Sequence, residues 1–284
     1  VGGGGGADLG VQACAGSTTA LAVVPAGTVP DLATALGGTA VDDAVAALRD
    51  GVRRPLDLGR VEGGPWFATV LCAGFDSAVN ERANAMRWPA GPRRYDLAIL
   101  AELAALRPEP LVVETEHDVL ELDALLVAVG NTTSYGGGIP VCPDASPDDG
   151  LFDLTVVEAA PRRTLLRMLP TLRTGRHVDH PAVRTLRARS VRLSGTSWVA
   201  YADGERMSGV PLSATCVPGA LTVVAAEPQA ARSAAEPQAA RSHPDQAHPD
   251  QAHPDQAHPD QAQPDQAHPA EPRRGDAASV TGAG

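Results

Sequence analysis

Two apolar segments separated by a long connection constrain the fold of this chain more than any other feature. Residues 125–129 and 151–157 each have the length and apolar character of a buried strand. The connection between them is too long for a simple turn, and loops of that length inside a compact domain tend to carry function. It contains Asn131 and three consecutive glycines at 136–138, which permit close approach of backbone or ligand. The pattern therefore predicts two core strands joined by a functional loop.

The same connection ends in an acidic turn. Asp144, Asp148 and Asp149 come just before Gly150, and carboxylates gathered on such a turn are hard oxygen ligands that suit magnesium or calcium. A solvated turn without a ligand explains these residues equally well. On spacing alone both interpretations stay open.

The C-terminal sixty residues have a different composition from the rest. From residue 225 the segment AAEPQAARS occurs twice and is followed by HPDQA repeats, with a proline every five residues. Such a segment cannot bury enough apolar surface to offset the entropy of ordering. We expect a disordered repeat tail over residues 225–284. Its histidines suit loose binding of transition metals, a less favoured interpretation because a disordered repeat must first become ordered.

Charge and residue usage exclude several classes of function. The chain has 34 acidic and 23 basic residues, a net charge of −11, which argues against a nucleic-acid binder. Every basic residue is an arginine, so neither a Schiff-base lysine nor a Walker lysine is available. No apolar run is long enough to span a membrane. The cysteines lack metal-site spacing, and we expect reduced thiols in the cytoplasm; they are Cys14, Cys72, Cys142 and Cys216.

Hydrophobic periodicity predicts a small glycine-rich α/β piece followed by a strand-rich region. The expected helices are 32–36 capped by Asp31, 41–50, 75–88, 95–106 and 162–173, the last interrupted near Pro170. The expected strands are 21–24, 55–61, 66–71, 111–116 and 119–129, with several more over 191–224. In helix 41–50 the expected apolar side consists of Val41, Val45, Ala46 and Leu48.

Two features of this pattern suit particular ligands. Strand 21–24, the PAGT turn at 25–28 and the next helix would present backbone N–H groups to a phosphate, although a flexible start also explains the glycine run at 2–6. Residues 162–176 combine five arginines with leucines in an amphipathic pattern suited to an anionic membrane surface. An ordinary surface helix is the favoured alternative there.

A series of short motifs then points to one family. In order they are GGGGG at 2–6 in the place of GGDGT, PAGT at 25–28 as the start of PxGTxND, LDLG at 56–59, AGFD at 73–76, VGNTTSYGGG at 129–138, PDASPDDGLFD at 143–153 and ADGE at 202–205. Together they resemble the diacylglycerol kinase catalytic-domain superfamily, which includes bacterial diacylglycerol kinases and sphingosine kinases. The resemblance covers roughly residues 1–224.

The resemblance implies an α/β plus all-β fold. Residues 1–51 would be the remnant of a doubly wound nucleotide-binding lobe whose first half is missing, and residues 52–224 a β-sandwich domain. The active site would lie between them and transfer the γ-phosphate of ATP to a diacylglycerol-like lipid hydroxyl with Mg²⁺. The implied partner is a lipid substrate at the membrane surface, with no nucleic acid and with a homodimer left open. The implied location is cytoplasmic with peripheral contact to the inner membrane surface.

The resemblance also assigns site residues. Asp203 and Glu205 would be the acids from which the catalytic base is drawn, without a choice between them, and Asp57 would belong to the magnesium network. Without the family, an Asp-Gly pair at 203–204 is more simply a hairpin turn. Gly3, Gly4, Gly5, Gly6 and Thr28 would contact the nucleotide phosphates, while Asp149 and the carbonyls of Ser146 and Leu151 would hold a second, structural magnesium.

Departures from the family pattern concentrate at the N-terminus. Gly4 and Gly6 replace the aspartate and threonine of GGDGT, Leu9 stands where the family has a glutamate, and Pro30 replaces an asparagine. We therefore expect a lipid kinase whose present chain binds ATP weakly and turns over slowly or not at all. The alternative is a non-catalytic lipid- or metal-binding remnant of such a kinase.

Overall fold

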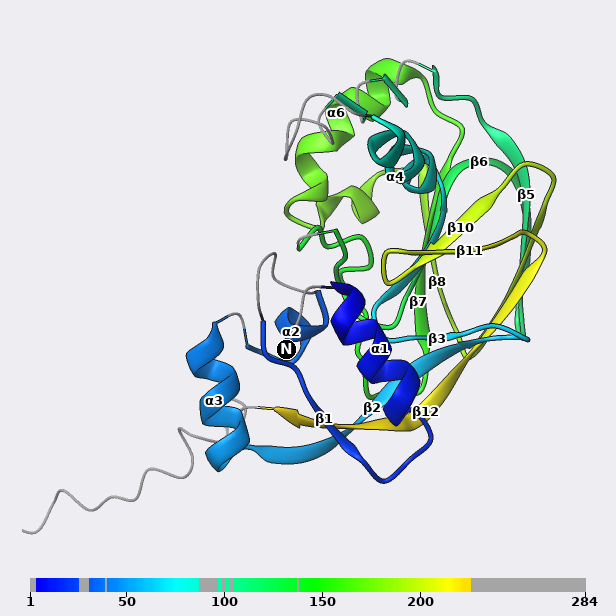
Figure 1. Cartoon of the computed structure of the whole chain (residues 1–284). Coiled ribbons are helices and arrows are strands. Elements are labelled where there is room, and N and C mark those ends of the chain that lie inside the picture. Colours follow the sequence, from blue (N-terminus) through cyan, green and yellow to red (C-terminus); the bar gives the residue numbers. More distant parts are fainter. Residues whose placement is uncertain are drawn as a thin grey trace, which may run out of the picture. The chain divides into compact units, whose positions relative to one another are not determined.

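A computed structural model describes residues 4–25, 31–38, 40–86, 97–98, 101–102, 105–136 and 138–225. The repeats beyond residue 225 lie outside these ranges, as do Gly3 and Thr28. Residues 1–237 form one compact unit, which contains all the described elements. This unit combines an α/β segment with a β-sandwich (Figure 1), so the predicted fold class is confirmed.

The N-terminal α/β segment builds its core together with two strands of the sandwich. Its elements are α1 (Gly4–Cys14), β1 (Ala20–Ala22), α2 (Asp31–Ala35) and α3 (Val41–Asp50). Strand β1 runs parallel to the last strand, β12 (Leu212–Ala225), with Leu21 opposite Val223. Val11 and Leu32 from this segment are buried in one cluster with Leu221 of β12. The predicted boundary at residue 51 stays a prediction, but no separate core marks it in the described chain.

The apolar side predicted for α3 is wrong. Val41, Val45 and Leu48 are 51%, 55% and 55% exposed, whereas the buried residues of the helix are Ala44 and Ala47. Small side chains on the inner face let the helix pack close to β12, the strand that it contacts. The larger apolar residues are left on the outer face.

Strands β2 to β12 form one hydrogen-bonded network. Its main path runs β11-β10-β4-β6-β5-β9-β12-β2-β3, while β7 pairs with β6 and β8 pairs with β7. The rings of Phe67 and Phe152 stack with centroids 5.5 Å apart, although β3 and β7 do not pair, so the two strands face each other across the core. The bounds are β2 Val52–Val61, β3 Trp66–Phe67, β4 Val70–Gly74, β5 Glu109–Thr115, β6 Val119–Gly130, β7 Phe152–Glu158, β8 Val183–Ala188, β9 Ser190–Gly195, β10 Val199–Ala202 and β11 Glu205–Gly209.

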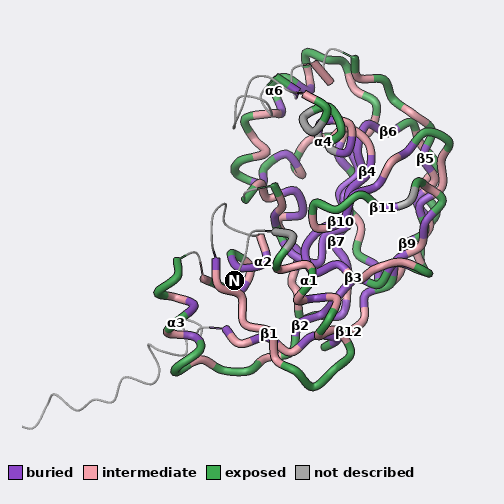
Figure 2. Tube along the Cα trace, in the orientation of Figure 1, coloured by how far each residue is buried: buried purple, intermediate pink, exposed green. Residues whose placement is uncertain are grey.

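The two apolar segments at 125–129 and 151–157 belong to neighbouring core strands. β6 pairs antiparallel with β7, so the long connection brings the chain back along the strand it left. The last seven residues of β6 are buried on both faces (Figure 2), which explains their uninterrupted apolar sequence. Val127 points into the sandwich core, and Leu126 belongs to an outer cluster with residues of α6 (Arg162–Leu172).

Smaller differences from the predicted elements have local causes. The single strand expected over 66–71 is two strands, because the chain turns between β3 and β4 at Ala68 and Thr69. Helix α4 (Phe75–Ala85) is followed by residues outside the described ranges, which include most of the helix expected over 95–106. Strand β12 includes Ala225, the first residue of the predicted tail. No helix in the described part of the chain is long and apolar enough to cross a membrane. The four cysteines are thiols that are not joined to one another in disulfides.

Candidate functional site

Several of the sequence motifs meet where the chain turns between β3 and β4. Asp203 lies in the ADGE motif, and its carboxylate accepts hydrogen bonds from this turn. Oδ2 accepts from the backbone N–H of Ala68 at 2.6 Å, while Oδ1 accepts from the N–H of Thr69 at 2.8 Å and from its hydroxyl at 2.5 Å. These bonds satisfy two N–H groups left unpaired by the break between the strands.

The backbone at Asp203 forms the hairpin turn that the Asp-Gly pair alone suggests. Strands β10 and β11 pair with Ala202 opposite Glu205. The two residues between them, Asp203 and Gly204, have φ values of 51° and 87°, as a two-residue type I′ turn requires. The tight turn points the Asp203 carboxylate at Ala68 and Thr69 and leaves Glu205 exposed at the start of β11. The structural and functional interpretations of this pair are therefore compatible.

Asn131, from the VGN motif, ties the same turn to β2. Its Nδ2 donates to the carbonyls of Ala68 and Asp57, both at 2.8 Å. Its backbone N–H donates to the carbonyl of Thr69 at 2.8 Å. Asn131 is fully buried, and its Oδ1 has no partner among the described residues. The sequence offered a signal here, since an asparagine directly after a buried apolar strand seldom lies there for packing alone.

Asp57 joins three segments that are far apart in sequence. Its carboxylate accepts from the N–H of Gly150 at 2.6 Å and of Gly219 at 2.7 Å, and its own N–H donates to the carbonyl of Pro147 at 2.8 Å. The residue is only 3% exposed. These contacts make Asp57 a brace between β2, the acidic loop and β12. Its predicted place in a magnesium network stays a prediction.

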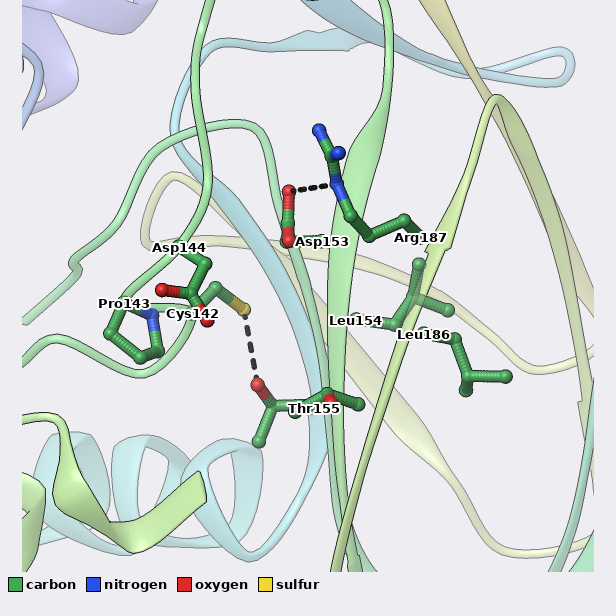
Figure 3. Close-up of a pocket in the computed structure, with 9 residues that line it drawn as sticks. Cys142, Pro143, Asp144, Asp153, Leu154, Thr155, Leu186 and Arg187 are labelled. Carbon is green, nitrogen blue, oxygen red and sulfur yellow. Dashed lines mark hydrogen bonds and ion pairs between the residues drawn. The ribbon is translucent and has the colours of Figure 1, made fainter. Parts of the chain in front are cut away.

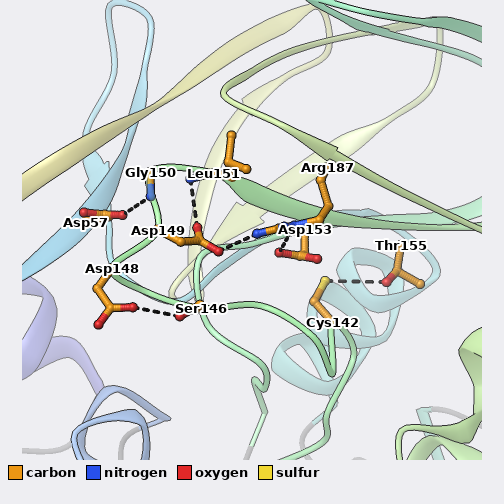
Figure 4. A network of polar contacts seen from close by, with 10 residues as sticks. All are labelled: Asp57, Cys142, Ser146, Asp148, Asp149, Gly150, Leu151, Asp153, Thr155 and Arg187. Carbon is orange, nitrogen blue, oxygen red and sulfur yellow. Dashed lines mark hydrogen bonds and ion pairs between the residues drawn. The ribbon is translucent and has the colours of Figure 1, made fainter.

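The acidic loop holds the residues predicted to bind the structural magnesium (Figure 4). Asp149 accepts from the N–H of Leu151 at 3.0 Å and forms an ion pair with Arg187, and Ser146 donates to Asp148 at 2.7 Å. One carboxylate with nearby backbone carbonyls has the hard oxygen chemistry that Mg²⁺ prefers, so the residue types fit such an ion. Arg187 would compete with it for Asp149. Within the described ranges, no cluster of three or more His, Cys, Asp or Glu side chains could hold a metal.

Arg187 also reaches a small cavity beside the loop (Figure 3). Its Nε lies 3.3 Å from the carboxylate of Asp153. Burial raises the pKa of Asp153, and the positive charge of Arg187 offsets part of that rise. Burial likewise raises the pKa of the Cys142 thiol, which also lines the cavity, to about 12, so this cysteine is no nucleophile near neutral pH. The volume is about 170 Å³, below the size of ordinary ligand pockets. This cavity is too small for a nucleotide.

Helix α1 brings a further acid toward Asp203. Asp8 accepts from Nε2 of Gln12 at 3.1 Å, and Gln12 exchanges two hydrogen bonds with the backbone of Trp66, next to the Ala68 turn. Burial raises the pKa of Asp203 most, the donors at Ala68 and Thr69 lower it, and the negative charge of Asp8 raises it further. Leu9, which stands where the family has a glutamate, is 71% exposed. Asp8, one position earlier, was not predicted as a site residue, although an acid two positions after the glycine run was a usable signal.

The residues predicted to contact the nucleotide phosphates lie at the start of the N-terminal α/β segment. Gly4, Gly5 and Gly6 form the first turn of α1, where free N–H groups suit an anion. Gly3 and Thr28 lie outside the described residues. Asp31, at the end of the PxGTxND motif, accepts from the N–H of Gly138 in the glycine loop at 3.1 Å. The structure therefore joins ADGE, VGN, LDLG and the acidic loop in one network and places α1 beside it.

Comparison with known families gives two adjoining matches. Residues 1–61 match the diacylglycerol kinase catalytic domain. Residues 69–225 match the YegS C-terminal NAD kinase beta sandwich-like domain. The turn at Ala68 and Thr69 lies at the junction of the two matched regions.

Individual proteins give the same result. The diacylglycerol kinase of Mycobacterium tuberculosis strain H37Rv is 41% identical over 222 residues, which cover 75% of this chain and 72% of that protein. A protein of Pseudomonas syringae described as a probable lipid kinase YegS-like is 30% identical over 213 residues. The match covers 74% of this chain and 69% of that protein. The diacylglycerol kinase of Bacillus subtilis is 29% identical, and the match spans 58% of its length. A solved putative diacylglycerol kinase of Bacillus anthracis shares the fold with a TM-score of 0.64 at 20% identity, covering 80% of this chain and 77% of that one.

Proposed function

We propose that this chain, which belongs to the family of diacylglycerol kinase-like lipid kinases, transfers the γ-phosphate of ATP to the hydroxyl of a diacylglycerol-like lipid. The observation that carries the proposal is the environment of Asp203. Three donors fix its carboxylate, yet among the described residues Oδ2 accepts one hydrogen bond, from Ala68. Since a carboxylate oxygen can accept two, Oδ2 keeps one position for the proton of a substrate hydroxyl.

In the proposed step Asp203 acts as the general base. The lipid oxygen attacks the γ-phosphorus, the bond from that phosphorus to the bridging oxygen breaks, and ADP leaves. The hydroxyl proton passes to Oδ2 of Asp203 and afterwards to water. Burial and Asp8 raise the pKa of Asp203, which makes it a stronger base than an ordinary aspartate. Glu205 is exposed and lacks such positioning, so we assign the base to Asp203.

The glycine run at the start of α1 would bind the phosphates. Gly4, Gly5 and Gly6 present backbone N–H groups at the positive end of an 11-residue helix. With no lysine in the chain, these N–H groups take on part of the charge neutralisation that phosphoryl transfer requires. Because Gly4 stands where the family has an aspartate, we expect weak ATP binding and a low rate.

Magnesium would be held by two groups of residues. Asp149 and the carbonyls of Ser146 and Leu151 would hold the structural ion, and Asp57 would belong to the network around the second. Mg²⁺ bound with ATP neutralises charge on the transferring phosphoryl group. Asp57 orients the acidic loop through Gly150, whichever ion is bound.

The direct test is incorporation of labelled phosphate from ATP into diacylglycerol by the purified chain. We expect a measurable rate that requires Mg²⁺, disappears in Asp203→Asn and persists in Glu205→Gln. A rate that Asp203→Asn leaves unchanged would contradict the proposed base.

A non-catalytic remnant is the competing outcome, favoured by one residue, Gly4. It predicts no incorporation at any enzyme concentration, together with thermal stabilisation by Mg²⁺ but none from Mg-ATP beyond that of the metal. The two measurements together separate a slow kinase from a binding module.

A further inference from the structure

Helix α6 has an outer face that its own fold does not use. Leu165 and Met168 are buried in the outer apolar cluster and anchor the helix on β6 and β7. At 100° per residue these two side chains lie on one side of the helix. Leu166 and Arg167 are exposed on the other side, and Arg162 is exposed on its flank; Figure 2 shows both buried and exposed stretches along α6.

The exposed side has an apolar centre with cations around it. Leu166 is 51% exposed, and Pro170 lies one turn further along the same face. Arg162 and Arg173 project on one side of this pair, and Arg163 and Arg167 project on the other. A face with an apolar strip between arginines fits the interface of a bilayer, where the strip enters the headgroup region and the guanidinium groups meet phosphates.

Within the described residues, no acidic side chain pairs with most of the cations on this face. Between Glu158 and Asp179 the sequence contains five arginines and no acidic residue. The two flanking acids are engaged, Glu158 with Arg184 at 2.5 Å and Asp179 with Arg176 at 3.8 Å. Among the described residues none forms an ion pair with the other four arginines, which are Arg162, Arg163, Arg167 and Arg173.

Helix stability does not explain these cations. Arg162 and Arg163 occupy the first turn of α6, which contains no acid and has no side-chain cap. Positive side chains are unfavourable at that end of a helix because the macrodipole is positive there. In a chain with a net charge of −11, four arginines without an ion pair among the described residues form a local positive surface suited to an anionic ligand.

We infer that the face formed by Arg162, Arg163, Leu166, Arg167, Pro170 and Arg173, here called the α6 face, docks on an anionic phospholipid surface. This inference rests on the proposed function, because an enzyme that phosphorylates a membrane lipid must reach its substrate in the bilayer. A nucleic acid would meet the same charges, but the exposed Leu166 and Pro170 at the centre would then stay in water. The α6 face therefore holds the protein on the membrane that contains its substrate.

Sedimentation of the full chain with vesicles tests the inference without any turnover. We expect binding to vesicles that mix phosphatidylglycerol with phosphatidylcholine, little binding to phosphatidylcholine alone, and weakening by added salt. Each arginine near an anionic surface strengthens binding about five-fold. The triple variant Arg162→Gln, Arg163→Gln, Arg167→Gln should therefore weaken partitioning by roughly 100-fold. Leu166→Gln should weaken binding while leaving net charge unchanged.

A matched control removes the same charge elsewhere. Arg49, Arg53 and Arg189 are exposed and belong to other elements, namely α3, β2 and the turn between β8 and β9. Their triple change to Gln should weaken vesicle binding far less. Thermal unfolding of each variant would show that the fold is intact. Equal losses in both triples, equal binding to neutral vesicles, or arginine-dependent binding to a single-stranded oligonucleotide but not to vesicles would overturn the inference. Vesicle binding by a chain that transfers no phosphate would refute the proposed function but would still support membrane docking by the α6 face.

Discussion

The carboxylate of Asp203 binds both the backbone N–H and the hydroxyl of Thr69, 134 positions earlier in the chain, at 2.8 and 2.5 Å. With the bond to Ala68, this contact stabilises the turn between β3 and β4, where the second family match begins at residue 69. The same carboxylate is the proposed catalytic base. One side chain therefore serves the fold and the chemistry, and variants must be designed to separate the two roles.

Asp203→Asn should affect both properties by different amounts. The amide NH₂ must face one of the N–H donors at Ala68 or Thr69, so we expect a loss of about 1–3 kcal/mol in the free energy of unfolding. Loss of the base should lower kcat by about 10²–10⁴-fold. Urea unfolding and the labelled-phosphate assay measure the two effects separately. Glu205→Gln, two residues away and exposed, is the control and should change neither.

Asp8→Asn should shift the pH dependence of the reaction. Removing a negative charge near Asp203 lowers the pKa of that carboxyl, because its ionised form is no longer repelled. The acid limb of the rate profile should move to lower pH, and the same shift should appear in a carbon NMR titration of Asp203, which needs no turnover. Asp42→Asn, on the exposed side of α3, should leave both unchanged. An unshifted Asp203 titration would show that Asp8 does not act on it.

Asp57→Ala should destabilise the protein more than a typical polar substitution. It leaves the N–H groups of Gly150 and Gly219 without their acceptor, and each unsatisfied buried donor costs about 1–3 kcal/mol. We expect a total loss of about 2–5 kcal/mol in the free energy of unfolding, measured by chemical denaturation in EDTA. Asp118→Ala, at an exposed hairpin, is the control. A loss seen only with Mg²⁺ present would instead identify Asp57 mainly as a metal-network residue.

Most strands of the sandwich could be predicted from the sequence, because the apolar pattern that indicates a strand lies within the strand itself. The run from Leu125 to Gly130 is apolar without alternation, and such a run predicts a strand buried on both faces. The identity of the family was likewise accessible, since several short motifs keep their order. The β10–β11 turn was predicted from Asp203 and Gly204 alone, whose backbone preferences are local.

What the sequence could not reveal depends on contacts between distant segments. Nothing in the apolar run around Ala68 and Thr69 indicates a break, because the break is stabilised by Asp203, 134 positions later. The apolar side of α3 was misassigned for a related reason. Periodicity favoured the larger residues Val45 and Leu48, whereas close packing on β12 favours Ala44 and Ala47. Which of two faces a short helix buries is decided by its neighbour.

Glu116 should make the free energy of unfolding decrease as the pH is lowered. Partial burial alone would raise its pKa, but the N–H groups of Arg189 and Ser190, at 2.5 and 3.0 Å, bring the pKa down to about 2. A carboxyl whose pKa is lower in the folded state stabilises the folded protein at pH values above its ordinary pKa. That stabilisation is lost as the pH falls toward the pKa of the folded state. Because the side chain is 30% exposed, we expect its ionised form to contribute only about 1 kcal/mol to the free energy of unfolding.

Urea unfolding at several pH values between about 6 and 3 would measure this contribution. The difference between wild type and Glu116→Gln should be constant near neutrality and shrink as the solution is acidified. Glu62→Gln, at the exposed turn after β2, is the control and should show no such trend. A Glu116→Gln difference that grew on acidification would contradict the assigned sign.

Gly59, the glycine of the LDLG motif, should tolerate no side chain. A Cβ at this position would overlap the ring of Phe67, which is fully buried and stacks on Phe152. Because neither ring can move without displacing the sandwich core, Gly59→Ala should lower the free energy of unfolding by about 3 kcal/mol or prevent folding. Gly38→Ala is the matched control, since its Cβ would lie 3.6 Å from the side chain of Asp43 and 4.0 Å from the carbonyl oxygen of Ala33, which are ordinary contacts. Near-equal unfolding midpoints for the two variants in urea would refute the close packing of β2 against Phe67, and rescue of Gly59→Ala by Phe67→Leu would support it.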